Sequence, residues 1–569
     1  MLCELQHQQS QVVEVSPKLS IENLREESIE RARIRLATRY DLRNVLPAAT
    51  GYVEEWSLHV GLEVTERLIV RIPERFPFEL PHLYLDSENH FRTLAHVNRK
   101  GRFCYLDETA IAYDYENIGN VCEEVVDRAV EALRNPSKLT EEDEFRKELF
   151  AYVAEAGSFL SLLVQSEAVR RVAILHIDTD DSDGPRFLAA ENVEAGTRWL
   201  KNAGFGAPKF VEAATYVPNA MPGRPPFPQT LFEFDQMVKA YDPAASGVWL
   251  KNLRDSRLFL TEVHSSLGPT LVAIRHEHSP FRKGLSQPKR KGFRPGKYPL
   301  RLEISVDRRD ERVSYYGGDR VDVERLANRT SPELASEGFS RILVVGVGAV
   351  GSNLIQGLCS AKLANSVALF DPDKVGSENV LRHTAKFYAV GYAKRVVVDV
   401  ELSRSFPWIE VRTYGNALDD QNTYVEEASQ ADLIVLTTGS QSLEKYLGQL
   451  AFASAKPGAK IVKAWLETEA NKGHVTINMK GLPGCPACWQ EVRATQDLDE
   501  LKREPGCGGS FANYGGSRLQ RFVATATDHI WATKEPIHLE WRPRNEETSS
   551  TDTVVLAKFA GEGCSECHE

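Results

Sequence analysis

The sequence predicts a multidomain α/β protein, and three observations lead to this prediction. The chain has 569 residues, which is more than one hydrophobic core usually accommodates, so two to four domains are expected. A helix, a run of strands and a second helix fill about the first 145 residues. From about residue 340, buried strands alternate with helices, and this order indicates a parallel, doubly wound sheet.

The first predicted domain covers residues 1–148 and has an α+β pattern. Its strands place apolar residues at every second position, as in the alternation from Trp56 to Val64. Its second helix turns Cys122 and other apolar residues to one side. A charge-rich run over residues 137–148 suggests where this domain ends. We expect its helices and strands over residues 21–44, 54–64, 67–73, 81–86 and 118–133.

The middle of the chain, residues 149–330, shows fewer patterns and is predicted as an α/β linker domain. Residues 170–178 and 268–279 have the composition of strands, and residues 190–205 that of a helix. Residues 282–301 contain eight Lys or Arg and no acidic residue. This basic run fits either a solvated loop or a docking surface for an acidic partner.

A glycine-rich turn opens the third predicted domain, residues 331–569. Gly346, Gly348 and Gly351 form the pattern GxGxxG between a buried strand and a helix. Glycines there allow a tight turn and let backbone N–H groups approach a phosphate at the helix N-terminus. Asp371 ends the next strand, where a carboxylate can hold a ribose hydroxyl. These residues predict a nucleotide site, although they fit NAD as well as ATP.

The residues that follow distinguish the two nucleotides. Asp373, Asn379, Arg382 and Lys394 come after the strand, and two cations suit a triphosphate attacked at its α-phosphorus, where charge builds on oxygen. The set GxGxxG, DxD, NxxR and GxxK resembles the ThiF/MoeB and ubiquitin-activating (E1) superfamily. This resemblance implies a Rossmann-like adenylation domain that uses ATP and Mg²⁺, with the glycines, the carboxylates and Asn379 binding the nucleotide and the two cations acting in catalysis.

One position departs from the pattern of that superfamily. The aspartate that usually binds Mg²⁺ aligns with Gly439. Either a nearby polar side chain replaces this aspartate as a ligand of Mg²⁺, or the chain binds Mg²⁺ in a different way. The candidates are Asp373, Asp432, Ser440 and Gln441.

Five cysteines of the third domain are candidates for metal binding or for catalysis. Two CxxC pairs have the spacing of a tetrahedral zinc site, with a redox couple as the alternative. The same superfamily often carries such pairs, which implies a structural zinc knuckle. Cys507 lies in a Gly- and Pro-rich stretch between the pairs, where activating enzymes place a catalytic cysteine in the crossover loop; otherwise it is a loop cysteine without a role. The pairs are Cys485 with Cys488 and Cys564 with Cys567.

The first domain resembles a ubiquitin-conjugating (E2, UBC-like) fold over about residues 20–145. The stretch FPFELPHLYL is similar to the YPxxPP segment of that family, and HVNRKGRFCYL is similar to its HPN…GxxC motif. The resemblance implies that Cys104 accepts an acyl group, that Asn98 helps to stabilise an oxyanion, and that His96 is structural. Val97 stands where the family has proline.

A chain with both modules resembles the bacterial activating–conjugating (E1–E2) fusion proteins of CBASS anti-phage operons. The resemblance implies that the C-terminus of a CD-NTase, a cGAS-like nucleotidyltransferase, or of a ubiquitin-like protein passes from Cys507 to Cys104 and then to a target lysine. It also implies a homodimer formed through the adenylation domain. Three alternatives remain at this point: a ThiF/MoeB-like sulfur-carrier adenylyltransferase, a non-enzymatic scaffold and an NAD-dependent dehydrogenase.

Composition also limits which partners and which cellular location we expect for this protein. The formal net charge of −11 argues against a general nucleic-acid partner. No run approaches 18 uninterrupted apolar residues, so no membrane partner is expected. The N-terminal residues lack the basic and apolar regions of a signal peptide. We therefore expect a cytoplasmic protein, in which cysteines serve as ligands, reactive thiols or core residues.

Overall fold

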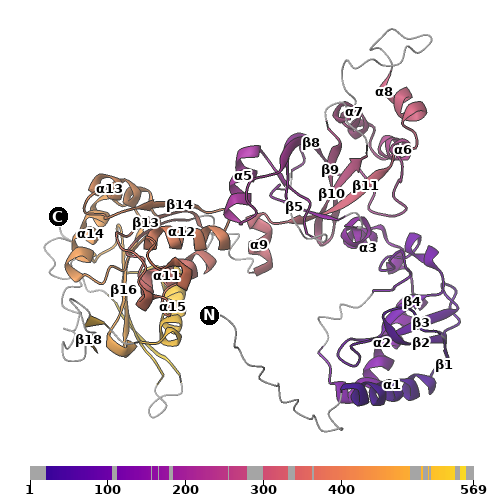
Figure 1. Cartoon of the computed structure of the whole chain (residues 1–569), viewed down its shortest axis with the longest axis horizontal. Coiled ribbons are helices and arrows are strands. Elements are labelled where there is room, and N and C mark those ends of the chain that lie inside the picture. Colours follow the sequence, from indigo (N-terminus) through magenta and orange to yellow (C-terminus); the bar gives the residue numbers. More distant parts are fainter. Residues whose placement is uncertain are drawn as a thin grey trace, which may run out of the picture. The chain divides into compact units, whose positions relative to one another are not determined.

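The structure is a computed structural model with two compact units, each described by itself (Figure 1). The first unit comprises residues 1–174, 179–191 and 211–320, and the second comprises residues 175–178, 192–210 and 321–569. The residues that the structure describes are 21–45, 47–104, 112–154, 157–164, 166–178, 184–253, 256–277, 299–330, 340–361, 364–486, 502–503, 510–511, 514–544 and 551–558.

The first unit begins with a four-stranded antiparallel sheet in the order β1-β2-β3-β4, and buried residues of two long helices join its core. The helix predicted over residues 21–44 is too long, because its last residues pair with β2 and form β1 instead. The ladder partners of β1 explain this end, since Asn44 lies opposite Trp56, a fully buried residue. The elements are α1 (Ile21–Ala37), β1 (Asp41–Asn44), β2 (Tyr52–His59), β3 (Arg67–Pro73), β4 (His82–Leu85) and α2 (Ile118–Arg134).

A closed barrel follows, with strands in the order β10-β11-β5-β7-β6-β8-β9. Some neighbouring strands are parallel, as β5 is to β11, and others are antiparallel, as β9 is to β10. The barrel strands are β5 (Ser158–Ser161), β6 (Arg170–His176), β7 (Phe187–Ala190), β8 (Phe210–Pro218), β9 (Leu258–Ser265), β10 (Gly268–His276) and β11 (Val313–Arg320). The helices of this part are α3 (Glu142–Lys147), α4 (Leu149–Val153), α6 (Leu231–Tyr241), α7 (Pro243–Asn252) and α8 (Leu300–Leu302).

The short helices α3 and α4 connect the sheet to the barrel through one shared core. Phe145, Leu149 and Tyr152 are buried in a cluster with barrel residues and with Ala95, which precedes the Cys104 loop. The charge-rich run predicted as a domain end therefore contains core residues as well. The predicted boundaries 1–148, 149–330 and 331–569 stay predictions, because a division into two compact units does not test a division into three domains.

The second unit contains an eight-stranded sheet in the order β14-β13-β12-β15-β16-β17-β20-β21. Its first five strands are parallel, as predicted, and the last three are antiparallel. The strands are β12 (Ser340–Val345), β13 (Ala364–Phe370), β14 (Glu410–Tyr414), β15 (Leu433–Leu436), β16 (Lys460–Leu466), β17 (Gly473–Met479), β20 (Ile537–Arg542) and β21 (Thr553–Lys558). A short separate pair is formed by β18 (Lys502–Arg503) and β19 (Ser510–Phe511).

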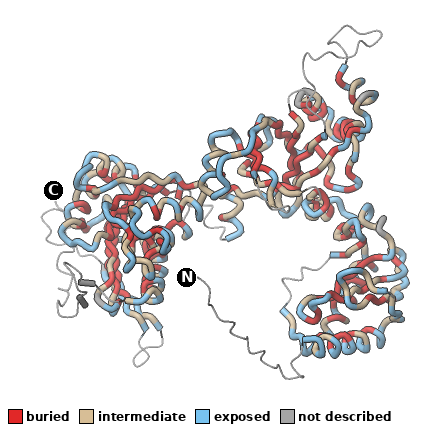
Figure 2. The backbone as a smooth tube through the Cα atoms, in the orientation of Figure 1, coloured by how far each residue is buried: buried red, intermediate tan, exposed pale blue. Residues whose placement is uncertain are grey.

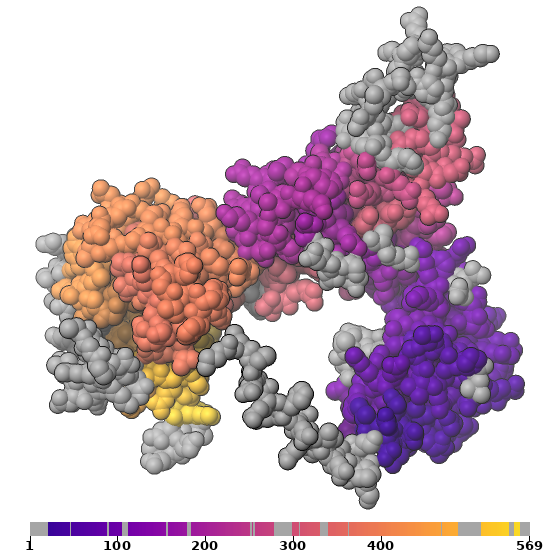
Figure 3. All heavy atoms as spheres, in the orientation of Figure 1, coloured from indigo at the N-terminus to yellow at the C-terminus, as the bar shows by residue number. Residues whose placement is uncertain are grey.

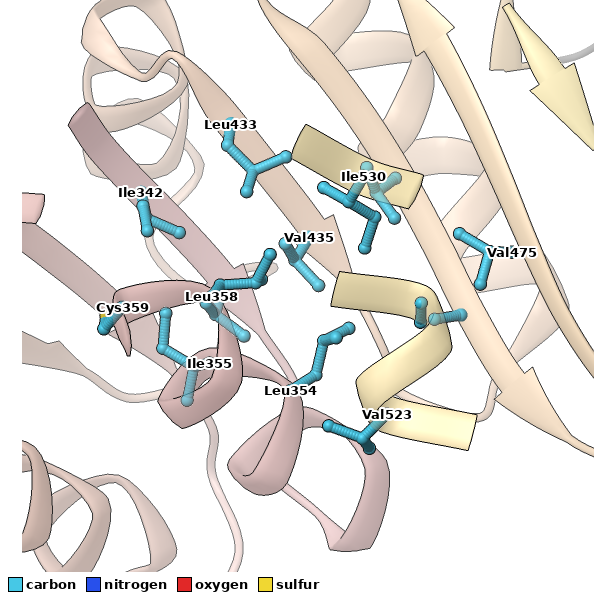
Figure 4. Packing of buried hydrophobic residues seen from close by; sticks show 14 of the residues in the cluster. Ile342, Leu354, Ile355, Leu358, Cys359, Leu433, Val435, Val475, Val523 and Ile530 are labelled. Carbon is cyan, nitrogen blue, oxygen red and sulfur yellow. The ribbon is translucent and has the colours of Figure 1, made fainter. Parts of the chain in front are cut away.

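Helices cover both faces of this sheet, because its central strands are apolar on both sides. Along β12, Ile342 and Val344 pack into one core, and Leu343 and Val345 pack into another. Figure 4 shows α11 and α15 side chains meeting the strands in the first of these cores, and buried residues fill the centre of each body in Figure 2. The helices of the whole unit are α5 (Val193–Asn202), α9 (Val323–Thr330), α11 (Ala349–Ala361), α12 (Lys394–Ser405), α13 (Gln421–Gln430), α14 (Gln441–Ser454) and α15 (Gly516–Ala532).

In the space-filling view, residues 340–558 of the second unit run in colour from red-orange to yellow (Figure 3). Within the described ranges, none of the helices combines the length and the apolar character that a membrane crossing requires.

Candidate active sites

The glycine turn follows β12, and two of its glycines have no room for a side chain. Gly346 has a φ of +87°, and a Cβ there would lie 2.7 Å from the carbonyl carbon of Thr437. A Cβ on Gly351 would lie 2.0 Å from the carbonyl oxygen of Gly346. A Cβ on Gly348 would meet no described atom within 4 Å. The open side of the turn is therefore at Gly348, where a phosphate can approach the N-terminus of α11.

Asp371 follows β13 and fixes this turn. Its Oδ2 accepts the N–H of Val347 at 2.8 Å, and its Oδ1 accepts the N–H of Asp373 at 2.8 Å. Burial raises the pKa of this carboxyl, and the two backbone N–H groups oppose that rise. A carboxylate oxygen can accept more than one hydrogen bond, so Asp371 can hold the turn and still receive a ribose hydroxyl.

His383 holds the glycine turn in place, and the sequence patterns did not identify it. Its Nδ1 accepts the N–H of Ala385 at 2.9 Å, which leaves the proton on Nε2, 2.6 Å from the carbonyl oxygen of Val347. Burial lowers the pKa of His383, which favours this neutral form. Asp371 and His383 thus hold the N–H and the C=O of the same loop residue. The only signal in the sequence is that a histidine directly follows Arg382.

The two predicted catalytic cations lie on the segment after β13, and each has a neighbour in the structure. The Nζ of Lys394 lies 3.1 Å from Oδ2 of Asp373. The guanidinium of Arg382 stacks over the ring of Tyr514 at 4.8 Å. Asn379 accepts the N–H of Gly376 through its side chain and the N–H groups of Arg382 and His383 through its carbonyl. Asn379 therefore shapes the turn that presents Arg382, and its contact with a nucleotide stays a prediction.

The region around Gly439 contains a second buried carboxylate. Glu444 is 1% exposed, and its Oε1 accepts the N–H of Gly439 at 3.0 Å and the hydroxyl of Thr438 at 3.2 Å. The hydroxyl of Thr437, just before them, donates to the carbonyl of Gly346 at 2.6 Å. Glu444 thus organises the loop beside the glycine turn, and it was not among the candidates named from the sequence for the missing aspartate.

The four candidate substitutes for the missing aspartate lie in different places. Asp432 precedes β15, whereas Gly439 follows it, so the strand separates the two by roughly 13 Å. The carboxylate of Asp432 accepts the N–H of Arg341 and pairs with Lys456. This excludes Asp432 as a ligand at the glycine turn. Ser440 and Gln441 lie at the start of α14, and Asp373 is exposed beside Lys394.

The loop before Cys104 is held against β4. The N–H of Phe103 donates to the carbonyl of Leu83, and the N–H of Cys104 donates to the carbonyl of His96 at 2.7 Å. Oδ1 of Asn98 accepts the N–H groups of Lys100 and Arg102 at 2.9 and 3.0 Å. Asn98 therefore fixes the turn, and its predicted contact with an oxyanion stays a prediction. Cys104 itself is exposed.

His96 links this loop to α3 and α4. Its φ of +63° lies in the left-handed region, its Nε2 lies 3.1 Å from Oε2 of Glu144, and its Nδ1 lies 3.1 Å from Oε1 of Glu148. Burial opposes the charged imidazole, but the two carboxylates outweigh it and raise the pKa of His96. The expected structural role of His96 thus has a physical basis, since a charged ring between two carboxylates fixes the loop.

Only the first of the zinc-knuckle cysteines is described. Cys485 is buried, and the backbone around it is fixed by Asn478, which donates to the carbonyl of Gly484, and by Lys463, which donates to that of Pro486. Among the described residues, no group of three or more metal ligands is formed. The zinc site and the catalytic role of the crossover cysteine stay predictions. Their residues Cys488, Cys507, Cys564 and Cys567 lie outside the described residues.

Two protein families match this chain, each over one of the two candidate sites. Residues 332–517 match the ThiF family, and residues 51–158 match the Prokaryotic E2 family B. The chain is therefore a fusion of an E1-like ThiF domain with a prokaryotic E2-like domain. The resemblance inferred from the glycine turn and from the Cys104 motif is confirmed for both domains.

The chain is also similar to the ATP-dependent ubiquitin transferase-like protein Cap2 of Enterobacter hormaechei subsp. hoffmannii (strain UCI 50). The two are 25% identical over 180 residues, which are 31% of this chain and 30% of that protein. The match thus spans under a third of the length of this relative.

Solved structures to which the chain is similar include E. coli MccB with MccA-N7isoASN, at a TM-score of 0.33, with 16% identity over 42% of this chain and 74% of that chain. They also include PaaA, at a TM-score of 0.29, with 17% identity over 41% of this chain and 68% of that chain. Likeness at this level carries no argument about function.

Proposed function

We propose that this protein adenylates the C-terminus of a partner protein, carries it as a thioester and joins it to a target amine. The observation that carries this proposal is the presence in one chain of an organised nucleotide turn and of an exposed cysteine on a rigid E2-like loop. A ThiF domain alone accounts for adenylation, but Cys104 gives the activated acyl group an acceptor.

In the adenylation step, ATP binds with its phosphates at Gly348 and its ribose at Asp371. The carboxylate of the partner attacks the α-phosphorus and pyrophosphate leaves. Arg382 and Lys394 stabilise the charge that builds on the phosphoryl oxygens. Mg²⁺ would assist near Asp373, whose exposed carboxylate already faces Lys394.

In the transfer steps, the Cys507 thiolate attacks the acyl adenylate and AMP leaves. The Cys104 thiolate then displaces Cys507, and a lysine amine finally displaces Cys104 to give an isopeptide bond. Each exchange joins groups of similar leaving ability, so ATP drives the sequence once. Structural zinc bound by Cys485, Cys488, Cys564 and Cys567 would hold the end of the chain on the ThiF domain.

The proposed partner is a CD-NTase, a cGAS-like nucleotidyltransferase, which would be primed for anti-phage defence in a CBASS operon in the cytoplasm. Similarity to Cap2 supports this setting. A ubiquitin-like modifier protein is the second candidate, and both would present a C-terminal carboxylate to the same site. We propose a homodimer formed through the ThiF domain as the working assembly.

Three substitutions test the order of the steps. Lys394→Gln should abolish ATP–pyrophosphate exchange. Cys507→Ala should keep the exchange and form no thioester, and Cys104→Ala should keep the Cys507 thioester but form no conjugate. Each is measured with radiolabelled pyrophosphate and by mass spectrometry of partner-linked peptides, with the buried helix residue Cys359→Ala as the control.

Loss of pyrophosphate exchange in Cys507→Ala would contradict this division of roles. A sulfur-carrier adenylyltransferase, the alternative function, would instead yield a thiocarboxylate and would keep full activity in Cys104→Ala.

A further inference from the structure

An exposed apolar surface lies on the segment between the two predicted catalytic cations and on the helix that follows. Phe387, Tyr388 and Tyr392 are 73%, 66% and 63% exposed, although large apolar side chains are more often buried. Val396 and Val400 on α12 are exposed as well, one helical turn apart on the same side of the helix. We call these five side chains the apolar ridge.

The fold holds the apolar ridge in place. The hydroxyl of Tyr388 donates to Oε1 of Glu401 on α12 at 3.1 Å, which fixes the loop against the helix. Ala389 and Val397 also pack in one small buried cluster that joins the same loop and helix. The folded backbone therefore presents the side chains of the ridge to solvent, and an exposed apolar patch of this kind marks an interaction surface.

The charges around the apolar ridge indicate which kind of partner it fits. Residues 382–395 contain four Lys or Arg and no Asp or Glu, in a chain whose net charge is −11. The flanking carboxylates of Asp373 and Glu401 are already bonded to Lys394 and Tyr388. An apolar centre with a basic rim complements a partner whose apolar patch has an acidic rim. A second copy of this chain fits less well, because a two-fold contact would place two basic segments against each other.

The apolar ridge is continuous with the nucleotide site. Leu381, which directly precedes Arg382, is 90% exposed. Tyr392 lies two residues before Lys394, and two residues span at most about 7 Å of backbone. A protein that presents its C-terminal carboxylate to these two cations therefore brings its folded part beside the ridge.

We propose that the apolar ridge binds the folded part of the protein whose C-terminus is adenylated, through an apolar patch that acidic residues surround. The inference rests on the proposed function, in which Arg382 and Lys394 act on that C-terminus. It adds a second recognition step, because the nucleotide site then binds the terminal carboxylate and the ridge binds the body of the partner. A peptide that contains only the C-terminal segment would need the two cations but not the ridge.

The test measures ATP–pyrophosphate exchange by the full chain with two probes, the whole CD-NTase proposed above as the partner and a synthetic peptide of its C-terminal segment. The double variant Phe387→Ser with Tyr392→Ser removes two aromatic side chains that the fold leaves exposed. We expect its KM for the whole CD-NTase to rise by about tenfold or more, and its KM for the peptide to stay unchanged. Tyr446→Ser, at an exposed aromatic residue of α14, is the matched control and should change neither value.

A second variant, Lys386→Glu, tests the charge of the partner. Lys386 is exposed and directly precedes Phe387. This change should raise the KM for the whole CD-NTase at low salt, and the difference from the wild type should shrink at high salt, because salt screens exposed charges. An unchanged or lower KM at low salt would overturn the acidic rim of the partner.

The remaining outcomes separate the explanations. If the double variant and the wild type have equal KM values for the whole CD-NTase, the ridge does not contact the partner, and the inference alone is overturned. A parallel rise for both probes also overturns it, because that pattern means that the ridge only shapes the nucleotide site. If the wild type exchanges pyrophosphate with neither probe, adenylation of a CD-NTase in the proposed function fails, and this inference fails with it.

Two measurements without the partner identify other occupants of the ridge. If the wild type sediments as a dimer and the double variant as a monomer, a second copy of the chain covers the ridge. If the double variant unfolds well below the wild-type temperature, the chain itself covers the ridge. Either result overturns the inference, which predicts an unchanged assembly and an unchanged Tm.

Discussion

At the scale of single residues, two stacked histidines show how the sheet of the second unit depends on protonation. Nδ1 of His474 lies 3.1 Å from Nε2 of His538, and Nε2 of His474 lies 2.9 Å from Oε1 of Glu467. Two ring nitrogens at this distance share one proton between them. Burial, followed by the charge of His474, lowers the pKa of His538 from 6.5 to about 4.

This shift predicts a loss of stability in mild acid. The unfolded chain binds a proton at His538 near pH 6.5, and the folded chain binds it only near pH 4. Stability is therefore complete above pH 6.5 and falls between these values, by roughly 2–3 kcal/mol. Thermal unfolding near pH 7 and about pH 5 should show a smaller fall in Tm for His538→Gln than for the wild type. Identical pH profiles would show that this pair does not control the fall.

Residue roles could be predicted only where a local pattern marks them. GxGxxG identified the tight turn because the glycine pattern itself is local, although Gly346 also meets the backbone of the distant Thr437. His383 gave no such signal, because its role depends on Val347, which lies 36 residues earlier and which the fold brings close.

At the scale of elements, the turn between β12 and α11 is a rigid unit, since side chains from outside it hold both backbone groups of Val347. Its geometry requires close contact of backbone with backbone at Gly351, and open space at Gly348. The two glycines should therefore respond differently to the same added methyl group.

Gly351→Ala should destabilise the second unit by about 1–3 kcal/mol or more, because the methyl group meets a backbone oxygen that cannot move aside. Gly348→Ala should leave Tm unchanged and weaken ATP binding, because its methyl group enters the space left for phosphate. Gly415→Ala, where nothing described lies within 4 Å, is the control. Thermal unfolding and calorimetric titration with ATP measure both effects. Equal Tm values for Gly351→Ala and Gly415→Ala would contradict this geometry.

Elements were predictable in proportion to how local their pairing is. The buried run of β12 forms a strand where it was predicted, whereas β2 ends at His59, five residues before the predicted strand end at Val64. The barrel was not predicted, because β5 pairs with β7 and also with β11, more than 150 residues later. Apolar periodicity indicates a strand but does not name such a distant partner.

At the scale of the whole molecule, the Cys104 loop and the barrel share a core. Phe145 is fully buried there, lies 6.4 Å from the ring of Tyr152 and packs under the guanidinium of Arg224 at 4.7 Å. Arg224 in turn lies beside the carbonyl of Arg92. A change in this core should therefore reach the E2-like site.

Phe145→Ala should cost about 3–5 kcal/mol of stability and should also change the rate at which iodoacetamide alkylates Cys104, measured well below the unfolding temperature. Phe159→Ala, a fully buried residue of the other barrel cluster, should cost a similar amount without changing that rate. If the two variants alter alkylation equally, the shared core does not control the loop.

The order of the chain in the second unit has a consequence for genetic dissection. Residues 192–210, with α5, belong to this unit although they lie between two barrel strands in the sequence, and Asn202 donates to the carbonyl of Pro407 at 3.1 Å. A gene divided between residues 330 and 340 would place α5 and α12, which it contacts, on different polypeptides. The ThiF half expressed alone would then lack part of its own surface, and co-expression of the two halves would be needed to supply it by fragment complementation.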